Sequence, residues 1–174
     1  MALPLLGIGA ALLAAYAGGK LSEHNQKREG NVGAFPGELE DKIVPANGAI
    51  LTCGVFGIFD HSGIWCDGHV VELKGNGLVR AVSPERFISE RSGSQIYVAG
   101  NDEGVAFGHA VTMQRATDQI YQYYAYDVFK NNCHRFVWRC VSGEDQPLTR
   151  FSELNAKLSD YFQSPVHWYP ASFK

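Results

Sequence analysis

A cysteine in the segment KNNCHRFVWRC, residues 130–140, has the surroundings of a nucleophile. Asn131 and Asn132 both favour the N-cap of a helix, so a helix is predicted to start beside Cys133. Residues Cys, Phe, Val, Cys and Val at positions 133, 136, 137, 140 and 141 have the spacing of one inward face. Because a helix N-terminus favours anions, the pKa of the Cys133 thiol should fall there. Cys140 lies further along the same face, away from the N-terminus, and is predicted to be a core residue.

A histidine and a carboxylate that could serve this thiol lie on a predicted hairpin. The dipeptide Asp-Gly at 67–68 separates two β-rich runs and is a strong signal for a two-residue turn. The pairs it predicts are Cys66 with His69, Trp65 with Val70, Ile64 with Val71 and Gly63 with Glu72. Alternation then places His61 and Glu72 on one face, roughly 7–8 Å apart between backbone positions, with Gly63 leaving room. His61 is predicted to be the base for Cys133, and Glu72 the group that fixes its tautomer.

The order of the remaining elements favours an α+β domain. Strands are predicted at 49–56, 61–66, 69–74, 78–83 and 95–100. A helical turn is predicted at 83–90, and helices at about 103–122, from 131 or 132 onward, and at 150–162. A meander followed by helices is typical of antiparallel sheets packed against helices. The tail from residue 164 is aromatic and interrupted by proline, so no element is predicted there.

The composition excludes several classes of protein. Hydrophobic residues make up 45% and charged residues 19% of the 174 positions, and the net charge is −3. No basic stripe indicates a nucleic-acid partner. Four cysteines, at 53, 66, 133 and 140, have neither CxxC spacing nor the density of a disulfide scaffold. A zinc set of Cys53, His61, Cys66 and His69 matches no zinc pattern, so neither a metal nor a cofactor is predicted.

The N-terminal segment is apolar. Residues 2–19 carry no charge, and eighteen such residues reach the lower bound for a membrane span. A signal peptide is a second interpretation, because AYA at 15–17 resembles a cleavage site, although no Lys or Arg precedes it. A helix docked on this domain or on a partner is the third. We divide the chain into this segment (1–19), a polar linker (20–43) and a catalytic domain (44–174), with membrane or envelope association slightly favoured over a cytoplasmic or secreted location.

Two blocks resemble a known family. HSGIWCDGHVVEL, residues 61–73, resembles the first block of the lecithin:retinol acyltransferase-like proteins, and NNCHRFV, residues 131–137, resembles their second block, Asn-Cys-Glu-His-Phe-Val. The resemblance covers about residues 44–141. It implies a circularly permuted papain-like (NlpC-type) fold in which an antiparallel sheet packs against the cysteine-bearing helix. It also implies Cys133 as nucleophile, His61 as base and Glu72 as the third polar residue.

The chain departs from the family pattern at two places. The third polar position holds Glu72 where the family has histidine, and His134 and Arg135 stand where the second block has Glu and His. His134 points about 100° away from Cys133 on the predicted helix, which places it at the surface or at the mouth of a cleft. Asp60 is the alternative orienting group for the histidine. Further supporting roles are predicted for Asn132, Trp65 and His134.

These features predict a thiol-dependent hydrolase or acyltransferase that works through an acyl-enzyme on Cys133. One substrate class is a lipid acyl group, which suits membrane contact through residues 2–19. The other is an amide of peptidoglycan or a peptide, as in NlpC-type hydrolases, including secreted antibacterial toxins. A non-catalytic interaction module with the same fold is the third hypothesis.

Overall fold

The computed structural model describes residues 18–55, 59–89 and 91–173, which form an α+β unit. Within them a seven-stranded mixed sheet has the order β1-β7-β6-β2-β3-β4-β5. The strands are β1 (Val32–Ala34), β2 (Ile50–Val55), β3 (Phe59–Cys66), β4 (His69–Leu73), β5 (Val79–Val82), β6 (Tyr97–Gly100) and β7 (Val166–Pro170). The helices are α2 (Pro84–Ile88), α3 (Ala110–Thr117), α4 (Cys133–Ser142) and α5 (Phe151–Phe162), and residues 18–28 are helical as well.

The β3–β4 hairpin has the predicted register. Cys66 pairs with His69, Trp65 with Val70 and Ile64 with Val71. Asp67 and Gly68 both have positive φ, 44° and 83°. A two-residue turn with positive φ at both positions matches the twist of its strands, which explains the Asp-Gly preference. Continuing this register places Gly63 opposite Glu72.

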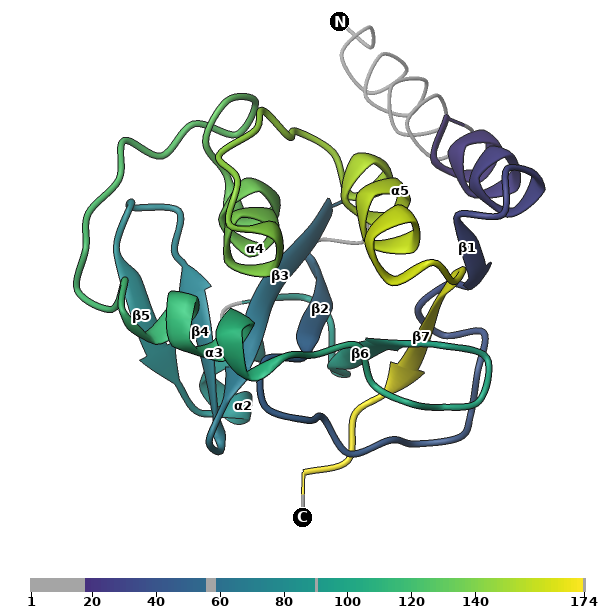
Figure 1. The fold of residues 1–174 in the computed structure, drawn as a ribbon, viewed down its shortest axis with the longest axis horizontal. Helices are drawn as coiled ribbons and strands as arrows, with labels where there is room; N and C mark the ends of the chain where they lie inside the picture. The colour runs from purple at the N-terminus through teal and green to yellow at the C-terminus, as the bar shows by residue number, and fades with distance from the viewer. Residues whose placement is uncertain (1–17, 56–58, 90, 174) are drawn as a thin grey trace, which may run out of the picture.

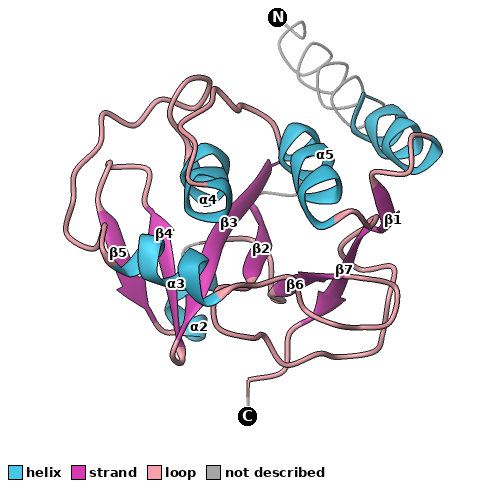
Figure 2. Ribbon diagram, viewed as in Figure 1, coloured by secondary structure: helices cyan, strands magenta, loops and turns pink. Residues whose placement is uncertain are grey.

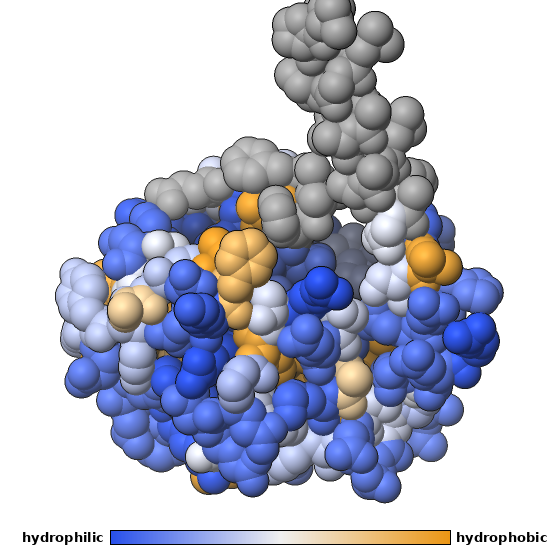
Figure 3. All heavy atoms as spheres, turned by 90° about the horizontal axis from the view of Figure 1, so that it is seen from above, coloured by the Kyte–Doolittle hydropathy of each residue, from blue (hydrophilic) through white to orange (hydrophobic). Residues whose placement is uncertain are grey.

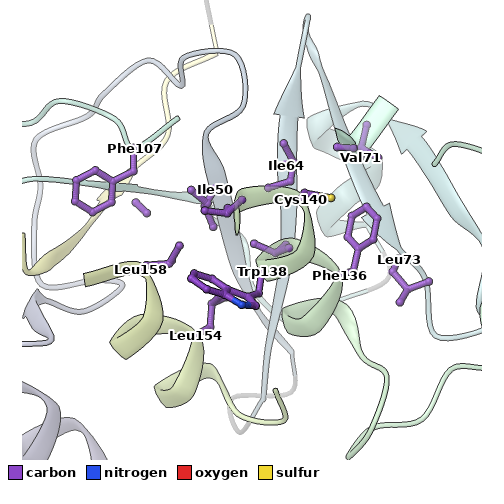
Figure 4. Packing of buried hydrophobic residues seen from close by; sticks show 14 of the residues in the cluster. Ile50, Ile64, Val71, Leu73, Phe107, Phe136, Trp138, Cys140, Leu154 and Leu158 are labelled. Atoms are coloured by element: carbon purple, nitrogen blue, oxygen red, sulfur yellow. The ribbon is translucent and has the colours of Figure 1, made fainter. Parts of the chain in front are cut away.

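Helix α4 begins where its cap predicts. The side chain of Asn132 accepts a hydrogen bond of 3.0 Å from the backbone N–H of Arg135, and the helix starts at Cys133. The predicted inward residues Phe136 and Cys140 are fully buried. Figure 4 shows both pointing toward β3 and β4. The packing of α4 on the sheet therefore fixes the position of the cysteine at its first turn.

Helices α4 and α5 lie on the same side of the sheet (Figure 1, Figure 2). Their inward side chains belong to one buried cluster that also includes Ile64 of β3 and Trp168 of β7. Viewed from above, the surface is largely hydrophilic, with apolar side chains scattered across it (Figure 3). The buried apolar side chains of the described residues thus form this cluster and a second one that includes Leu51, Val70 and Phe87.

The predicted helix at 103–122 is wrong over most of its length, because only α3 is helical there. Gly104 has a φ of 78°, and a Cβ at Gly108 would lie 2.7 Å from the backbone nitrogen of Ala49. The approach to α3 is instead extended, and Phe107 donates a backbone hydrogen bond to Ala99. Apolar residues do recur at helical spacing there, but Gly104 and Gly108 allow the backbone to come close to the sheet in a non-helical conformation.

Two segments that the sequence assigned to loops contain regular structure. In the expected linker at 20–43, the helix continues to residue 28 and β1 follows. The tail contains β7, which pairs in parallel with β1. Pairing between distant parts of the chain leaves no local signal, and the prolines at 165 and 170 lie at the ends of β7, where they are tolerated. Residues 2–17 of the apolar segment lie outside the described residues; in the described part, no helix is long and apolar enough to cross a membrane.

A series of buried side-chain hydrogen bonds links the N-terminal helix, residues 18–28, to α5 and β7. Asn155 of α5 donates to Gln26 at 3.0 Å and accepts from the indole N–H of Trp168 at 3.1 Å. We expect Gln26→Ala to lower the free energy of unfolding by about 1–3 kcal/mol, because it leaves the fully buried Asn155 amide without its acceptor. Urea unfolding of both proteins measures the difference. Gln114→Ala, at an exposed position bonded within α3, is the matched control and should cost less than about 0.5 kcal/mol.

Candidate active site

The predicted histidine and glutamate are in direct contact. His61 Nε2 lies 2.7 Å from Oε2 of Glu72, on neighbouring strands. Gly63 is required in that hairpin, because a Cβ there would lie 2.7 Å from a methyl carbon of Val70. The ring of Phe87 covers the imidazole at 5.3 Å between centroids. Since Glu72 holds Nε2, the other ring nitrogen of His61 is left for a second partner.

Glu72 is itself held by two arginines that the sequence analysis missed. Its Oε1 accepts from Arg80 at 2.9 Å, and its Oε2 accepts from Arg91 at 2.6 Å. Burial acts to raise the pKa of Glu72, but the hydrogen bond and charge of His61 together with the two arginines lower it to about 2. Arg80 could have been found, because it pairs directly with Glu72 across β4 and β5. Arg91 follows α2 and gives no local signal.

Cys133 lies between two imidazoles at the start of α4. Burial acts to raise the pKa of its thiol, but the charges of His134 and His61 and their hydrogen bonding hold that pKa well below its usual range. Burial acts to lower the pKa of His61, while the charge and hydrogen bonding of Cys133 and the hydrogen bond with Glu72 raise it to about 8. This combination favours a thiolate beside an imidazolium.

His134 is buried, and the expectation that it would lie at the surface is wrong. It is 5% exposed, and its Nδ1 lies 3.0 Å from Ser62 Oγ and 4.0 Å from the sulfur of Cys133. The first turn of α4 sits so deeply between β3 and α5 that a side chain turned away from Cys133 still meets protein. Its ring lies 5.6 Å from that of Phe151.

The remaining predicted residues have different surroundings. The carboxylate in contact with His61 is that of Glu72 rather than that of Asp60. Asn132 caps α4 and donates to two backbone carbonyls, so it holds the helix start. The rings of Trp65 and Phe173 lie 4.9 Å apart between centroids and are tilted by 35°. Tyr126 lies near the thiol and was not singled out; burial and the charge of Cys133 raise the pKa of its phenol to about 12, so it remains a hydrogen-bond donor.

Compared with known proteins, the sequence matches no family model and no curated protein. In the described ranges, no group of three or more His, Cys, Asp or Glu side chains is placed to hold a metal ion. The chemistry of the site therefore has to be inferred from the thiol, the two imidazoles and the buried carboxylate.

The four thiols should differ in reactivity. At neutral pH we expect iodoacetamide to label Cys133 before the others, because burial raises the pKa of each of the other three thiols to about 12. Those three are Cys53, Cys66 and Cys140. Timed alkylation followed by peptide mapping measures the order. Labelling of any other thiol ahead of Cys133 would contradict the assignment of the nucleophile.

Proposed function

We propose that this chain is a thiol-dependent hydrolase or acyltransferase that forms an acyl-enzyme on Cys133. The observation that supports it most is the pairing of a thiol at a helix N-terminus with an imidazole that a fully buried carboxylate holds. The same constellation activates a cysteine for attack on acyl carbons. The order of a histidine-bearing hairpin before a cysteine-bearing helix supports the permuted papain-like fold and the likeness to lecithin:retinol acyltransferase-like proteins.

The geometry suggests the following reaction. The Cys133 thiolate attacks the acyl carbon, and the His61 imidazolium gives its proton to the leaving amine or alkoxide. A thioester remains on the sulfur. His61, now neutral, takes a proton from water or from an acceptor alcohol or amine, which attacks the thioester and releases the acyl product with the thiolate restored. The backbone N–H groups of Cys133 and His134, ahead of Arg135 whose N–H is bonded to Asn132, and the Tyr126 phenol are donors for the tetrahedral oxyanion.

Trapping the acyl-enzyme tests the proposal. Incubation with p-nitrophenyl acetate should release a burst of nitrophenol and leave an acetyl group on Cys133, located by mass spectrometry of peptides. Cys133→Ala should show neither, while Cys140→Ala, which changes a fully buried thiol of the same helix, should still be acetylated. If wild type and Cys133→Ala release nitrophenol at the same rate, the chain is a non-catalytic module.

A further inference from the structure

A hollow lies on the sheet face that carries α4. It has a volume of about 340 Å³ and is lined by Pro36, by Thr52 and Gly54 of β2, by Asp60 of β3, by residues 92–95 and by Tyr97, and its surface is as much apolar as polar. Thr52 pairs with Ser62, and Gly54 with Asp60, across these neighbouring strands (Figure 1). Ser62 bonds His134 beside Cys133, and the charges of both residues act on Asp60, so the hollow lies on the same side of the sheet as the reacting sulfur.

Asp60 is the ionisable group of this hollow. Within the described part of the chain, its carboxylate makes no hydrogen bond or ion pair with another side chain, although it is half-buried. Burial raises its pKa to about 6; the charge of His134 lowers it, and the charges of Cys133 and Glu23 raise it. At neutral pH a mostly ionised carboxylate therefore faces the hollow, where a cation or a hydrogen-bond donor of a substrate can reach it.

The lining discriminates between the two substrate classes. Pro36 and Tyr97 supply apolar lining, but a fatty acyl chain in the hollow would also lie against Asp60 and would desolvate its carboxylate without compensation. An ammonium group would instead gain a charge-assisted hydrogen bond from the carboxylate. The chemistry of the hollow thus fits an amine-bearing acyl compound better than a lipid tail.

We propose that this hollow is a substrate subsite in which Asp60 binds a primary ammonium group next to the carbonyl that Cys133 attacks. The inference rests on the proposed acyl-enzyme function and narrows its substrate to acyl compounds with a free amino group near the scissile bond, such as peptides with a free amino terminus. Asp60 is then the residue that determines specificity, and it takes no part in the chemistry at sulfur.

Paired substrates test the proposal. Alanine p-nitroanilide carries a free ammonium group, and its N-acetyl form carries an uncharged amide in that place. Wild type should show a kcat/KM higher by about tenfold or more for the free amine, mainly through KM. Asp60→Asn should lose that preference, because it removes the carboxylate that binds the ammonium group. Asp160→Asn, which removes an exposed carboxylate of another hollow, is the control and should keep the preference. Equal kcat/KM values for the two substrates in wild type would overturn the proposal.

Protection of the thiol separates failure of the subsite from failure of the proposed function. Alaninamide should slow alkylation of Cys133 by iodoacetamide at least about tenfold at saturation, and N-acetylalaninamide should not. Protection without any turnover would overturn the acyl-enzyme while the subsite stands. Turnover of nitrophenyl esters without protection would overturn the subsite alone. The comparison of kcat/KM values and the protection from alkylation are both measured on wild type, so they test the subsite even if Asp60→Asn does not fold.

Discussion

Replacing His61 by alanine is expected to slow acyl transfer by on the order of 10²–10⁴-fold, the usual contribution of a general acid–base group. In the proposed reaction His61 pairs with the thiolate and protonates the leaving group, and Oε2 of Glu72 holds its ring from 2.7 Å away at Nε2. His134→Ala should cost less than about tenfold, because a Ser62 hydroxyl, not a carboxylate, holds His134. Single-turnover acylation by an anilide or an alkyl ester, whose leaving group needs a proton, compares the two. A larger loss in His134→Ala would reverse the roles of the imidazoles.

The pH dependence of the acylation rate provides a second test of the role of His61. His61 has a raised pKa of about 8, so its proton is lost as the pH rises through that value. The rate of acylation by a substrate with a poor leaving group should therefore fall above a pH of about 8, because such a group departs only when it is protonated. The rate of acylation by an activated ester, which needs no proton donor, should not fall. Identical alkaline limbs for the two substrates would contradict the role of His61 as acid.

Replacing Glu72 by glutamine is expected to lower the free energy of unfolding by about 3–5 kcal/mol, because it leaves two largely buried arginines without their counter-charge. Arg80 and Arg91 both bond the carboxylate, which has no exposed surface. Urea unfolding at neutral pH measures the loss. Glu103→Gln, which removes the same charge from an exposed position, should leave the unfolding midpoint unchanged. A small loss in Glu72→Gln would show that the arginines find other partners.

The stabilisation that the same carboxylate provides should be lost at low pH. Its folded pKa of about 2 lies below its ordinary value of 4.5. The stabilisation is therefore complete above a pH of about 4.5 and is lost as the pH falls through 2. The stability difference between wild type and Glu72→Gln should shrink across that window, as acid unfolding followed by circular dichroism can measure.

Much of the candidate site could be predicted because its geometry depends on short-range signals. The Asp-Gly turn fixes the β3–β4 register, and with it the diagonal from His61 to Glu72. Asn132 fixes the start of α4 and hence the position of Cys133. Each rule involves residues that are close in the chain, so a single sequence contains the information.

The parts that escaped prediction depend on tertiary packing. His134 is buried because the first turn of α4 is surrounded by other parts of the protein. Helical periodicity predicts only the direction in which its side chain points from the helix, not what that side chain contacts. Arg91 reaches Glu72 from a separate connection, and β1 pairs with β7 over most of the chain. The glycines before α3 were a usable signal against a long helix, but the apolar spacing was given more weight.

The parallel pairing of β1 with β7 has a consequence for how the chain is made. On the ribosome β1 is synthesised early, but its hydrogen-bonding partner strand is the last of the described elements to emerge. Until Val166 and His167 are available, Val32 and Ala34 form an unpaired edge beside an incomplete core. The domain therefore completes its sheet only late in translation, and nascent chains that stall before β7 are the species most in need of chaperones.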